Sequence, residues 1–424
     1  MDRRHTNFPK HFFWGGSTAA HQVEGGLHNQ WTVWELAHAK ELAQTAHRHL
    51  SYLHNWDEIK NQAEEPENYI SGRGVEHYKR YKEDFKLAGG LNLNAFRFTI
   101  EWSRIEPEEG KWDEKEISHY REYIKELRRQ KLEPFLTLWH WTLPVWFYEK
   151  GGFEKNENLA YFDRYVKKVA EELLEDVEYV ITLNEPNVDA TFAYLIELHP
   201  PAKRSLVKFW HVYWNLTRVH KRAYQILKTA KPSLQVGMSA QLANIQAKRP
   251  HNYLDQLTTQ WMRYFWNWWF LNRIRHHQDF IGLNYYFSDY YSGIGKRYNP
   301  KVPLNDLGWY MEPEGIYPLL LRAWSRFKKP IFITENGLAD SGDQYRRWWI
   351  EQTIVAMERA ISEGVELRGY FHWSLLDNFE WQDGWWPKFG LVHVDRENGM
   401  KRTVRSSARW YAKLLSEIQN QNKI

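Results

Sequence analysis

The sequence predicts an α/β fold, a single (β/α)8 barrel that spans residues 1–424. Short apolar or β-branched runs alternate with longer helical segments, a pattern typical of parallel strands joined by crossover helices. Eight such units fit one barrel of this length, and no Ser/Gly-rich linker marks a domain junction. The rival fold, a doubly wound open sheet, is disfavoured because its glycine-rich phosphate turns, G-x-G-x-x-G and G-x-x-x-x-G-K-[ST], are missing. We therefore expect the active site at the carboxyl ends of the strands.

Each proposed strand is a short apolar run, and turn-forming residues follow several of them. In chain order the strands are His11–Ser17, Asn94–Ile100, Glu133–His140, Glu178–Asn184, Gln235–Ala240, Asp279–Tyr286, Pro330–Glu335 and Arg368–Ser374.

The segments between the strands carry apolar residues at spacings of three and four, with charged residues elsewhere, which predicts amphipathic helices. The clearest are Glu116–Gln130, Leu159–Glu172, Phe209–Thr229 and Tyr345–Glu363.

Composition excludes several classes of protein. Hydrophobic residues make up 43% of the chain and charged residues 26%, which is ordinary for a globular protein. The net charge of +4 is spread without basic runs, so we expect no nucleic-acid partner. The chain has no cysteine, which removes disulfides, zinc–thiolate sites and cysteine nucleophiles. No H-E-x-x-H motif occurs among its 19 histidines, and we expect neither a metal nor a cofactor.

No segment approaches the ~18 uninterrupted apolar residues of a membrane span, and no apolar stretch of signal length is found. The most apolar aromatic run, Trp261–Phe270, is too short and contains Arg263 and Asn267. We therefore expect a cytoplasmic protein with no membrane partner, and the sequence leaves a homo-oligomer open.

Polar clusters end three of the proposed strands. Glu185 follows an apolar strand and precedes Pro186, and Glu335 follows the apolar run Pro330–Thr334 in the same way. The last strand leads into Asp377–Trp381. A lone glutamate after a strand is usually an ordinary rim residue, but two in matching positions are what a glycosidase needs. One protonates the departing oxygen and the other attacks the anomeric carbon.

Ordered strings along the chain resemble family 1 glycoside hydrolases, the β-glucosidase and β-galactosidase group. The strings are FFWGGSTAAHQVEG, RFTIEWSRI, TLWHWTLPVW, TLNEP, DFIGLNYY, ITENG, GYFHWSLLDNFEW and FGLVHVD. The resemblance covers essentially the whole chain, and it implies a (β/α)8 barrel that hydrolyses β-glycosides with retention of configuration.

By this resemblance Glu185 is the general acid/base and Glu335 the nucleophile. Glu185 needs a weakly solvated site that keeps it protonated, whereas Arg97 and the Tyr286 hydroxyl are expected to keep Glu335 ionised. A retaining pair should have its carboxyl groups ~5 to 5.5 Å apart, and an inverting pair ~6.5 to 9.5 Å apart.

The same resemblance implies the residues that bind the sugar. Asn184 is expected to donate to the 2-hydroxyl, Asn284 to support it, and Trp373 to lie under the sugar ring. The remaining hydroxyls and the pocket wall are expected to involve Gln22, His140, Trp141, Tyr286, Glu380, Trp381 and Phe389.

The expected reaction is hydrolysis of terminal β-D-glucosides, with galactosides or fucosides also accepted, in small oligosaccharides or aryl and alkyl glycosides. An acid at Glu380 would repel a phosphate dianion, which favours unphosphorylated sugars. A β-mannosidase of the same fold is an alternative. A sugar-binding barrel without turnover is a second alternative, disfavoured because binding does not require both Glu185 and Glu335.

Several positions depart from the family pattern. His21 replaces a usual tyrosine, Thr142 a usual aspartate, and Lys388 a usual arginine. The stretch 241–279 is shorter than usual, which predicts a wider entrance and tolerance for bulky aglycones. Aromatic residues make up 17% of the chain. Beyond the sugar-facing rings, we assign Trp261, Trp266, Trp268, Trp269, Trp348 and Trp349 to packing, a rim surface or a subunit contact.

Overall fold

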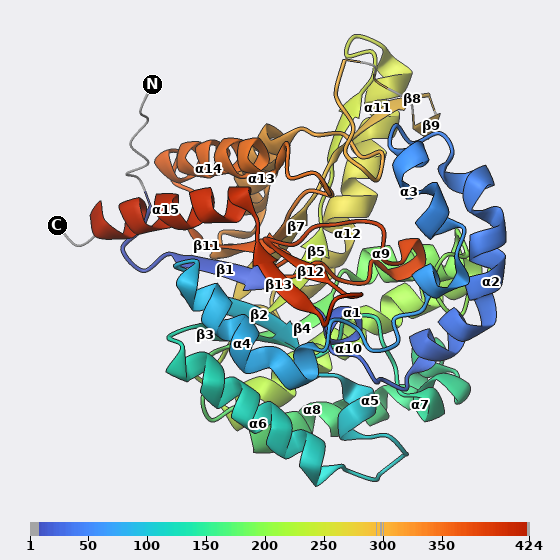
Figure 1. The fold of residues 1–424 in the computed structure, drawn as a ribbon, viewed down its shortest axis with the longest axis vertical. Coiled ribbons are helices and arrows are strands. Elements are labelled where there is room, and N and C mark those ends of the chain that lie inside the picture. The colour runs from blue at the N-terminus through green and yellow to red at the C-terminus, as the bar shows by residue number, and fades with distance from the viewer. Residues whose placement is uncertain (1–7, 294, 297–298, 300, 422–424) are drawn as a thin grey trace.

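The computed structural model describes residues 8–293, 295–296, 299 and 301–421. Eight parallel strands close a barrel in the order β1-β11-β10-β7-β5-β4-β3-β2, so the first and last barrel strands of the chain are neighbours (Figure 1). They are β1 Phe13–Ser17, β2 Ala95–Thr99, β3 Glu133–Thr137, β4 Tyr179–Asn184, β5 Gln235–Gln241, β7 Phe280–Tyr285, β10 Ile331–Asn336 and β11 Leu367–Trp373.

The predicted (β/α)8 barrel is confirmed, and each predicted run overlaps one barrel strand. The main differences are at the strand ends. The third strand was predicted to reach His140, but β3 ends at Thr137. The chain leaves the sheet there, and Trp141 adopts a left-handed backbone conformation with φ 73°. Conversely, β5 and β10 each continue one residue further than predicted, to Gln241 and Asn336.

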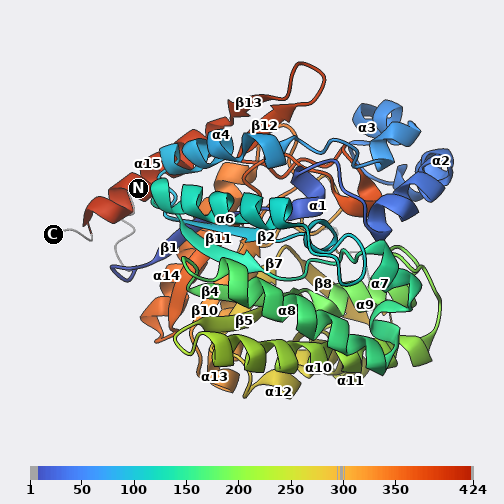
Figure 2. The same ribbon diagram turned by 90° about the horizontal axis from the view of Figure 1, so that it is seen from below.

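Helices surround the barrel on its outside (Figures 1 and 2). The predicted helical segments form, with small shifts at their ends. The first begins at Glu114 because the Asp113 side chain accepts from the backbone N–H groups of Lys115 and Glu116. The outer helices are α4 His77–Gly90, α6 Glu114–Arg129, α8 Leu159–Leu173, α10 Leu206–Ala230, α12 Trp269–Ile274, α13 Ile316–Phe327, α14 Arg346–Ser362 and α15 Ser406–Gln421.

The remaining elements build the rim and the loops beyond the barrel. The helices are α1 Ala20–Val23, α2 Gln30–Leu50, α3 Trp56–Ala63, α5 Trp102–Ile105, α7 Val145–Glu149, α9 Pro186–Tyr194 and α11 Tyr253–Met262, followed by the π-helix Arg263–Trp268. A small sheet contains β6 Asn244–Ala247, β8 Ser288–Ser292 and β9 Gly295–Lys296, and β12 Val392–Asp395 pairs with β13 Lys401–Val404.

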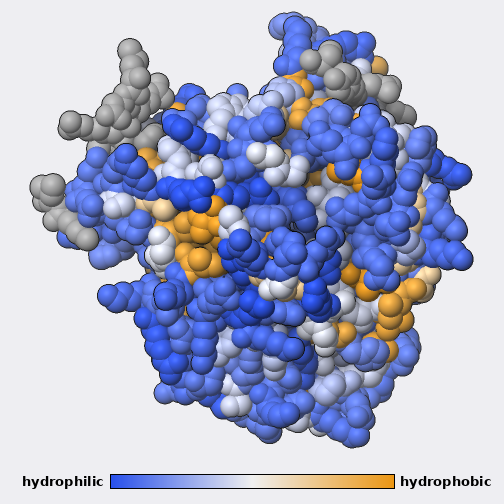
Figure 3. Space-filling model, in the orientation of Figure 1, coloured by the Kyte–Doolittle hydropathy of each residue, from blue (hydrophilic) through white to orange (hydrophobic). Residues whose placement is uncertain are grey.

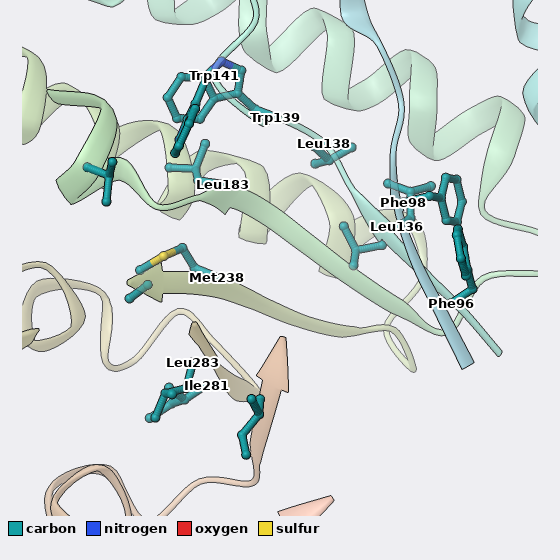
Figure 4. Packing of buried hydrophobic residues seen from close by; sticks show 14 of the residues in the cluster. Phe96, Phe98, Leu136, Leu138, Trp139, Trp141, Leu183, Met238, Ile281 and Leu283 are labelled. Carbon is teal, nitrogen blue, oxygen red and sulfur yellow. The ribbon is translucent and has the colours of Figure 1, made fainter. Parts of the chain in front are cut away.

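Alternate residues of one strand enter different clusters, as the two-residue period of a strand requires. Ala95 of β2 joins an aromatic group with Phe135 and Phe332 at the barrel centre. Phe96 and Phe98 join the large cluster between the strands and the outer helices (Figure 4). Arg97 lies between them in the chain and is 1% exposed. Because side chains alternate along a strand, it is on the same side of β2 as Ala95.

The surface in view in Figure 3 is mostly hydrophilic, with scattered apolar patches. Some large apolar side chains are nevertheless exposed on α11, among them Tyr253, Leu257 and Trp261. Within the described ranges, no helix is both long and apolar enough to cross a membrane.

Candidate active site

A cavity of about 710 Å³ contains the two predicted glutamates and nearly all of the other predicted site residues. Arg97, Asn184 and Asn284 are not part of its wall, but they are buried and hydrogen bonded to residues around it. The predicted residues in the wall are Gln22, His140, Trp141, Glu185, Tyr286, Glu335, Trp373, Glu380, Trp381 and Phe389.

Irregular strand ends hold the two glutamates. The register between β10 and β7 shifts between Ile333 and Glu335, and that between β4 and β5 shifts between Ile181 and Asn184. Such irregularities redirect side chains and are common beside active sites. Glu185 follows directly in a left-handed conformation, with φ 44°, at the start of α9. This backbone strain at a cavity residue is a mark of a functional position.

Glu335 is bound by positive charge and by a hydroxyl. The Arg97 Nη1 group donates to Glu335 Oε1 in a buried ion pair. The Tyr286 hydroxyl donates to the other oxygen, Oε2, at 2.6 Å. Burial raises the pKa of Glu335, while Arg97, Tyr286 and Asn284 oppose that rise by stabilising the carboxylate.

Glu185 has a different environment. Asn284 Nδ2 donates to Glu185 Oε1 at 2.8 Å, and no cation among the described residues is bonded to the carboxyl group. Burial, followed by the charge of Glu335, raises the pKa of Glu185 to about 8. Because only Glu335 is paired directly with a guanidinium, we take Glu335 as the group that ionises first and Glu185 as the one that holds its proton.

A network of amides connects both glutamates and orients His140. Asn184 Oδ1 accepts from Arg97 Nη2 at 2.6 Å and from Asn284 Nδ2 at 3.2 Å. The Asn184 Nδ2 group therefore donates to His140 Nε2, 2.9 Å away. Burial lowers the pKa of His140 well below its usual value, so the ring is neutral with its proton on Nδ1. That N–H is buried and has no partner among the described residues, which leaves it available to a ligand.

Gln22 and Glu380 offer further polar atoms at the cavity. Gln22 Nε2 donates to the Phe379 carbonyl at 2.6 Å, while Gln22 Oε1 is buried and has no partner among the described residues. Burial, then the charges of Asp383, Glu335 and Glu185, raises the pKa of Glu380 well above its ordinary value. A ligand with hydroxyl groups would satisfy these atoms.

Three predicted aromatic residues form walls rather than polar contacts. Trp373 and Phe389 belong to one buried cluster with Tyr286. Trp141 was expected to hydrogen bond to sugar hydroxyls, but its indole N–H donates to the Asn184 carbonyl at 3.1 Å. Trp141 therefore offers a ring surface, because its only donor is already used within the protein.

Sequence reasoning missed the outer wall of the cavity. It is lined by Val188 and Phe192 of α9 and by Ile196 of the loop that follows the helix, and these residues are spaced four apart in the chain. That spacing is a helix-face signal, but it is equally typical of a core-facing helix. Met262 and Trp266 come from the stretch predicted to be shortened, so this stretch still walls the cavity.

Trp266 packs against the buried core, as predicted, but it also lines the cavity, a role that the sequence did not indicate. Its indole N–H donates to Gln241 Oε1, which anchors it at the end of β5. Trp268, Trp269 and Trp349 are buried as predicted, and Trp261 and Trp348 lie at the surface.

The chain matches the model of glycosyl hydrolase family 1 in two segments, residues 4–275 and 270–420. A 1,4-beta-D-glucan glucohydrolase of Thermotoga neapolitana is 30% identical over 472 aligned residues, covering 96% of this chain and 98% of that protein. Beta-glucosidase A of Thermotoga maritima is 31% identical and covers 96% of this chain and 97% of its own length.

Solved structures show the same fold. A beta-glycosidase from Pyrococcus horikoshii superposes with a TM-score of 0.85 at 34% identity, covering 97% of this chain and 95% of the other. The Thermotoga maritima beta-glucosidase in complex with glucoimidazole has a TM-score of 0.85 at 28% identity, covering 97% and 99%. With matches to the family model and to these relatives over nearly its whole length, this chain belongs to glycosyl hydrolase family 1, and it is an O-glycosyl hydrolase.

Proposed function

We propose that this enzyme is a retaining β-glycosidase that removes the terminal non-reducing β-D-glucosyl residue, and that it also accepts galactosides and fucosides. The contrast between the two glutamates carries the proposal. Glu335 is bound by Arg97 and Tyr286, whereas Glu185 is buried, is bonded to no cation among the described residues, and has its pKa raised to about 8. One ionised and one protonated carboxyl group are the two reactants of double displacement.

In the first step the Glu335 carboxylate attacks the anomeric carbon and forms an ester bond to it. The bond between that carbon and the glycosidic oxygen breaks, and the oxygen takes the proton of Glu185. Arg97 holds Glu335 in place, but its ion pair must weaken as the carboxylate charge passes into the ester. The aglycone leaves with a new hydroxyl group, and Glu185 becomes a carboxylate.

In the second step water replaces the aglycone. The Glu185 carboxylate takes a proton from the water as its oxygen attacks the anomeric carbon, and the ester bond to Glu335 breaks. Glu335 returns as a carboxylate and Glu185 as an acid. Two inversions at the same carbon leave the sugar with its original configuration.

The polar atoms without partners support a sugar in the inner cavity. The His140 Nδ1–H and Gln22 Oε1 are buried, one a donor and the other an acceptor. Glu380 lies beside Gln22, with Gln22 Nε2 3.4 Å from Glu380 Oε2. Neighbouring acceptors and donors of this kind suit adjacent sugar hydroxyls.

The outer cavity supports an apolar aglycone. Its wall includes Phe192, Ile196, Met262 and Trp266, and the volume of about 710 Å³ exceeds what one sugar ring needs. We infer that aryl and alkyl β-glycosides are better substrates than small disaccharides. A panel of aryl β-glycosides differing only in the sugar, with cellobiose beside them, tests both the sugar and the aglycone preference.

Substitution of the nucleophile tests the mechanism. Glu335→Gly should abolish hydrolysis of an aryl β-glucoside, and azide or formate should restore turnover by entering the space of the missing carboxylate. Nuclear magnetic resonance of the first sugar released by the wild type should show the β anomer. Unchanged activity of Glu335→Gly, or release of the α anomer, would show that the mechanism is different.

A further inference from the structure

His21 is a buried imidazole behind the sugar-binding end of the cavity. It is 1% exposed and belongs to α1, the helix that also places Gln22 in the cavity wall. Its ring stacks on the indole of Trp381, with 5.2 Å between the ring centroids and 10° between the planes. Trp381 lines the cavity and His21 does not, so His21 can affect a bound sugar through this indole.

Both ring nitrogens of His21 are hydrogen bonded. Nε2 lies 2.6 Å from Glu35 Oε1, and Nδ1 lies 3.2 Å from Asn29 Nδ2. The Asn29 Oδ1 atom accepts from the backbone N–H of Thr32 at the start of α2, so Asn29 presents its amide N–H to His21. Nδ1 is therefore the acceptor, and Nε2 carries the proton that it donates to Glu35.

Glu35 is itself fixed in place by hydrogen bonds from Ser71. Its second oxygen, Oε2, accepts from the backbone N–H of Ser71 at 2.9 Å and from the Ser71 hydroxyl at 2.7 Å. With His21 this makes a set of three donors around a carboxyl group whose side chain is 2% exposed. Such bonds offset the cost of removing the carboxyl group from water. The imidazole therefore cannot turn without leaving a buried polar group unpaired.

Trp381 depends on such external support because its own backbone is strained. It has a left-handed conformation with φ 51°, which costs a non-glycine residue free energy and persists only where the surroundings hold it. The surroundings are rings, since Trp31 and Trp141 each lie 4.7 Å from the Trp381 centroid at tilted angles. His21 is the closest of these rings to parallel with the indole. His140 also stacks on it, but less closely, with 5.9 Å between the centroids and 24° between the planes.

We propose that His21, held by Glu35 and Asn29, is a positioning residue that sets the plane of the Trp381 indole for sugar binding. This inference rests on the proposed function, because its readout is hydrolysis of a β-glycoside. In this arrangement Glu35 of the rim helix α2 is hydrogen bonded to the His21 imidazole, and that imidazole stacks on the Trp381 indole in the cavity wall.

The test uses His21→Phe, which keeps a flat ring but removes both hydrogen bonds. The ring then has no bonded partner that sets its plane, and we expect kcat/KM for an aryl β-glucoside to fall about tenfold or more. The matched control is His38→Phe on α2, the helix that carries Glu35. His38 stacks on Trp34 with 4.6 Å between the centroids, and it lies outside the cavity wall. Its kcat/KM should stay within about twofold of the wild type.

A double-mutant cycle separates positioning from general destabilisation. If His21 acts through Trp381, the His21→Phe/Trp381→Phe enzyme should lose no more kcat/KM than the worse single variant. Thermal unfolding of each variant reports stability separately. Where His21→Phe does not fold, His21→Gln replaces it, because a glutamine amide can still donate to Glu35 while the stacked ring is gone.

Two outcomes would overturn the inference. One is a folded His21 variant with wild-type kcat/KM, and the other is a fully additive loss in the cycle. A wild-type enzyme with no activity on any β-glycoside would instead contradict the proposed function, so the two failures are distinguishable.

Discussion

Tyr286→Phe isolates one hydrogen bond to the proposed nucleophile. The Tyr286 hydroxyl donates to Glu335 Oε2 at 2.6 Å, and both residues are buried. A hydrogen bond to a charged group contributes about 1.5 to 3 kcal/mol. Its loss favours the protonated form, so the pKa of Glu335 should rise by about one to two units, at 1.36 kcal/mol per unit.

Glu335 must be ionised to attack, so activity is lost as the pH falls through its pKa. The acid limb of kcat/KM against pH should therefore move to higher pH by about one to two units. The basic limb, which reports the loss of the proton from Glu185, should move less. The bell-shaped pH profile should therefore become narrower. Because the two carboxyl groups interact, each limb of the pH profile gives an apparent pKa of the pair and not of one residue alone.

The matched control is Tyr285→Phe, one residue away on β7. The Tyr285 hydroxyl donates to the Glu312 carbonyl at 2.5 Å, and Tyr285 does not line the cavity. This variant should lose stability but keep both limbs. The assay is initial rates of an aryl β-glucoside across pH, with circular dichroism to check the fold. An unchanged acid limb in folded Tyr286→Phe would refute the reasoning.

Three further variants probe other parts of the site. In Glu185→Gln the basic limb near pH 8 should disappear, because no proton is lost as the pH rises, and glycosides with poor leaving groups should react far more slowly than activated aryl glycosides. A retained basic limb would mean that another group titrates there. Trp266→Ala should raise KM for aryl and long-chain alkyl glycosides about tenfold, or ~1.4 kcal/mol, and leave methyl glycosides unaffected, since Trp266 lines the outer cavity. Equal effects on both substrate types would place the ring elsewhere in the mechanism. In Gly337→Ala the new Cβ would lie 1.8 Å from the Trp373 carbonyl oxygen, so the strand ends must separate, with a loss of about 2 to 4 kcal/mol in chemical denaturation. A wild-type unfolding midpoint would show that the strand ends adjust at no cost.

Much of the barrel could be predicted because its signals are local. The run Glu178–Asn184 has an apolar or β-branched interior, Tyr179–Leu183, and ends before Pro186, and both features are visible in the sequence itself. The same holds for the two glutamates, since Glu185 directly follows β4 and Glu335 lies near the end of β10. Helix ends depend on capping side chains such as Asp113, and there the predictions were off by a few residues.

The outer wall and the use of particular hydrogen-bond donors could not be predicted. Trp266 lies in an aromatic run where a cavity residue and a core residue look alike, and only the path of the π-helix brings its ring to the cavity. Trp141 matched a family position for a sugar ligand, but its N–H is consumed by the Asn184 carbonyl. Neither outcome has a periodic signature in the chain.

By itself the sequence determined the barrel, its strand order along the chain and the pair of glutamates, because alternating apolar runs and strand-end carboxyl groups are properties of neighbouring residues. Only the tertiary structure decided how the two glutamates differ. Arg97, Tyr286 and Asn284 come from other strands or strand ends than Glu335 and Glu185, and closing the barrel removes them all from water. Charge and burial then act across those strands, which is why the proton affinities of the pair depend on the fold.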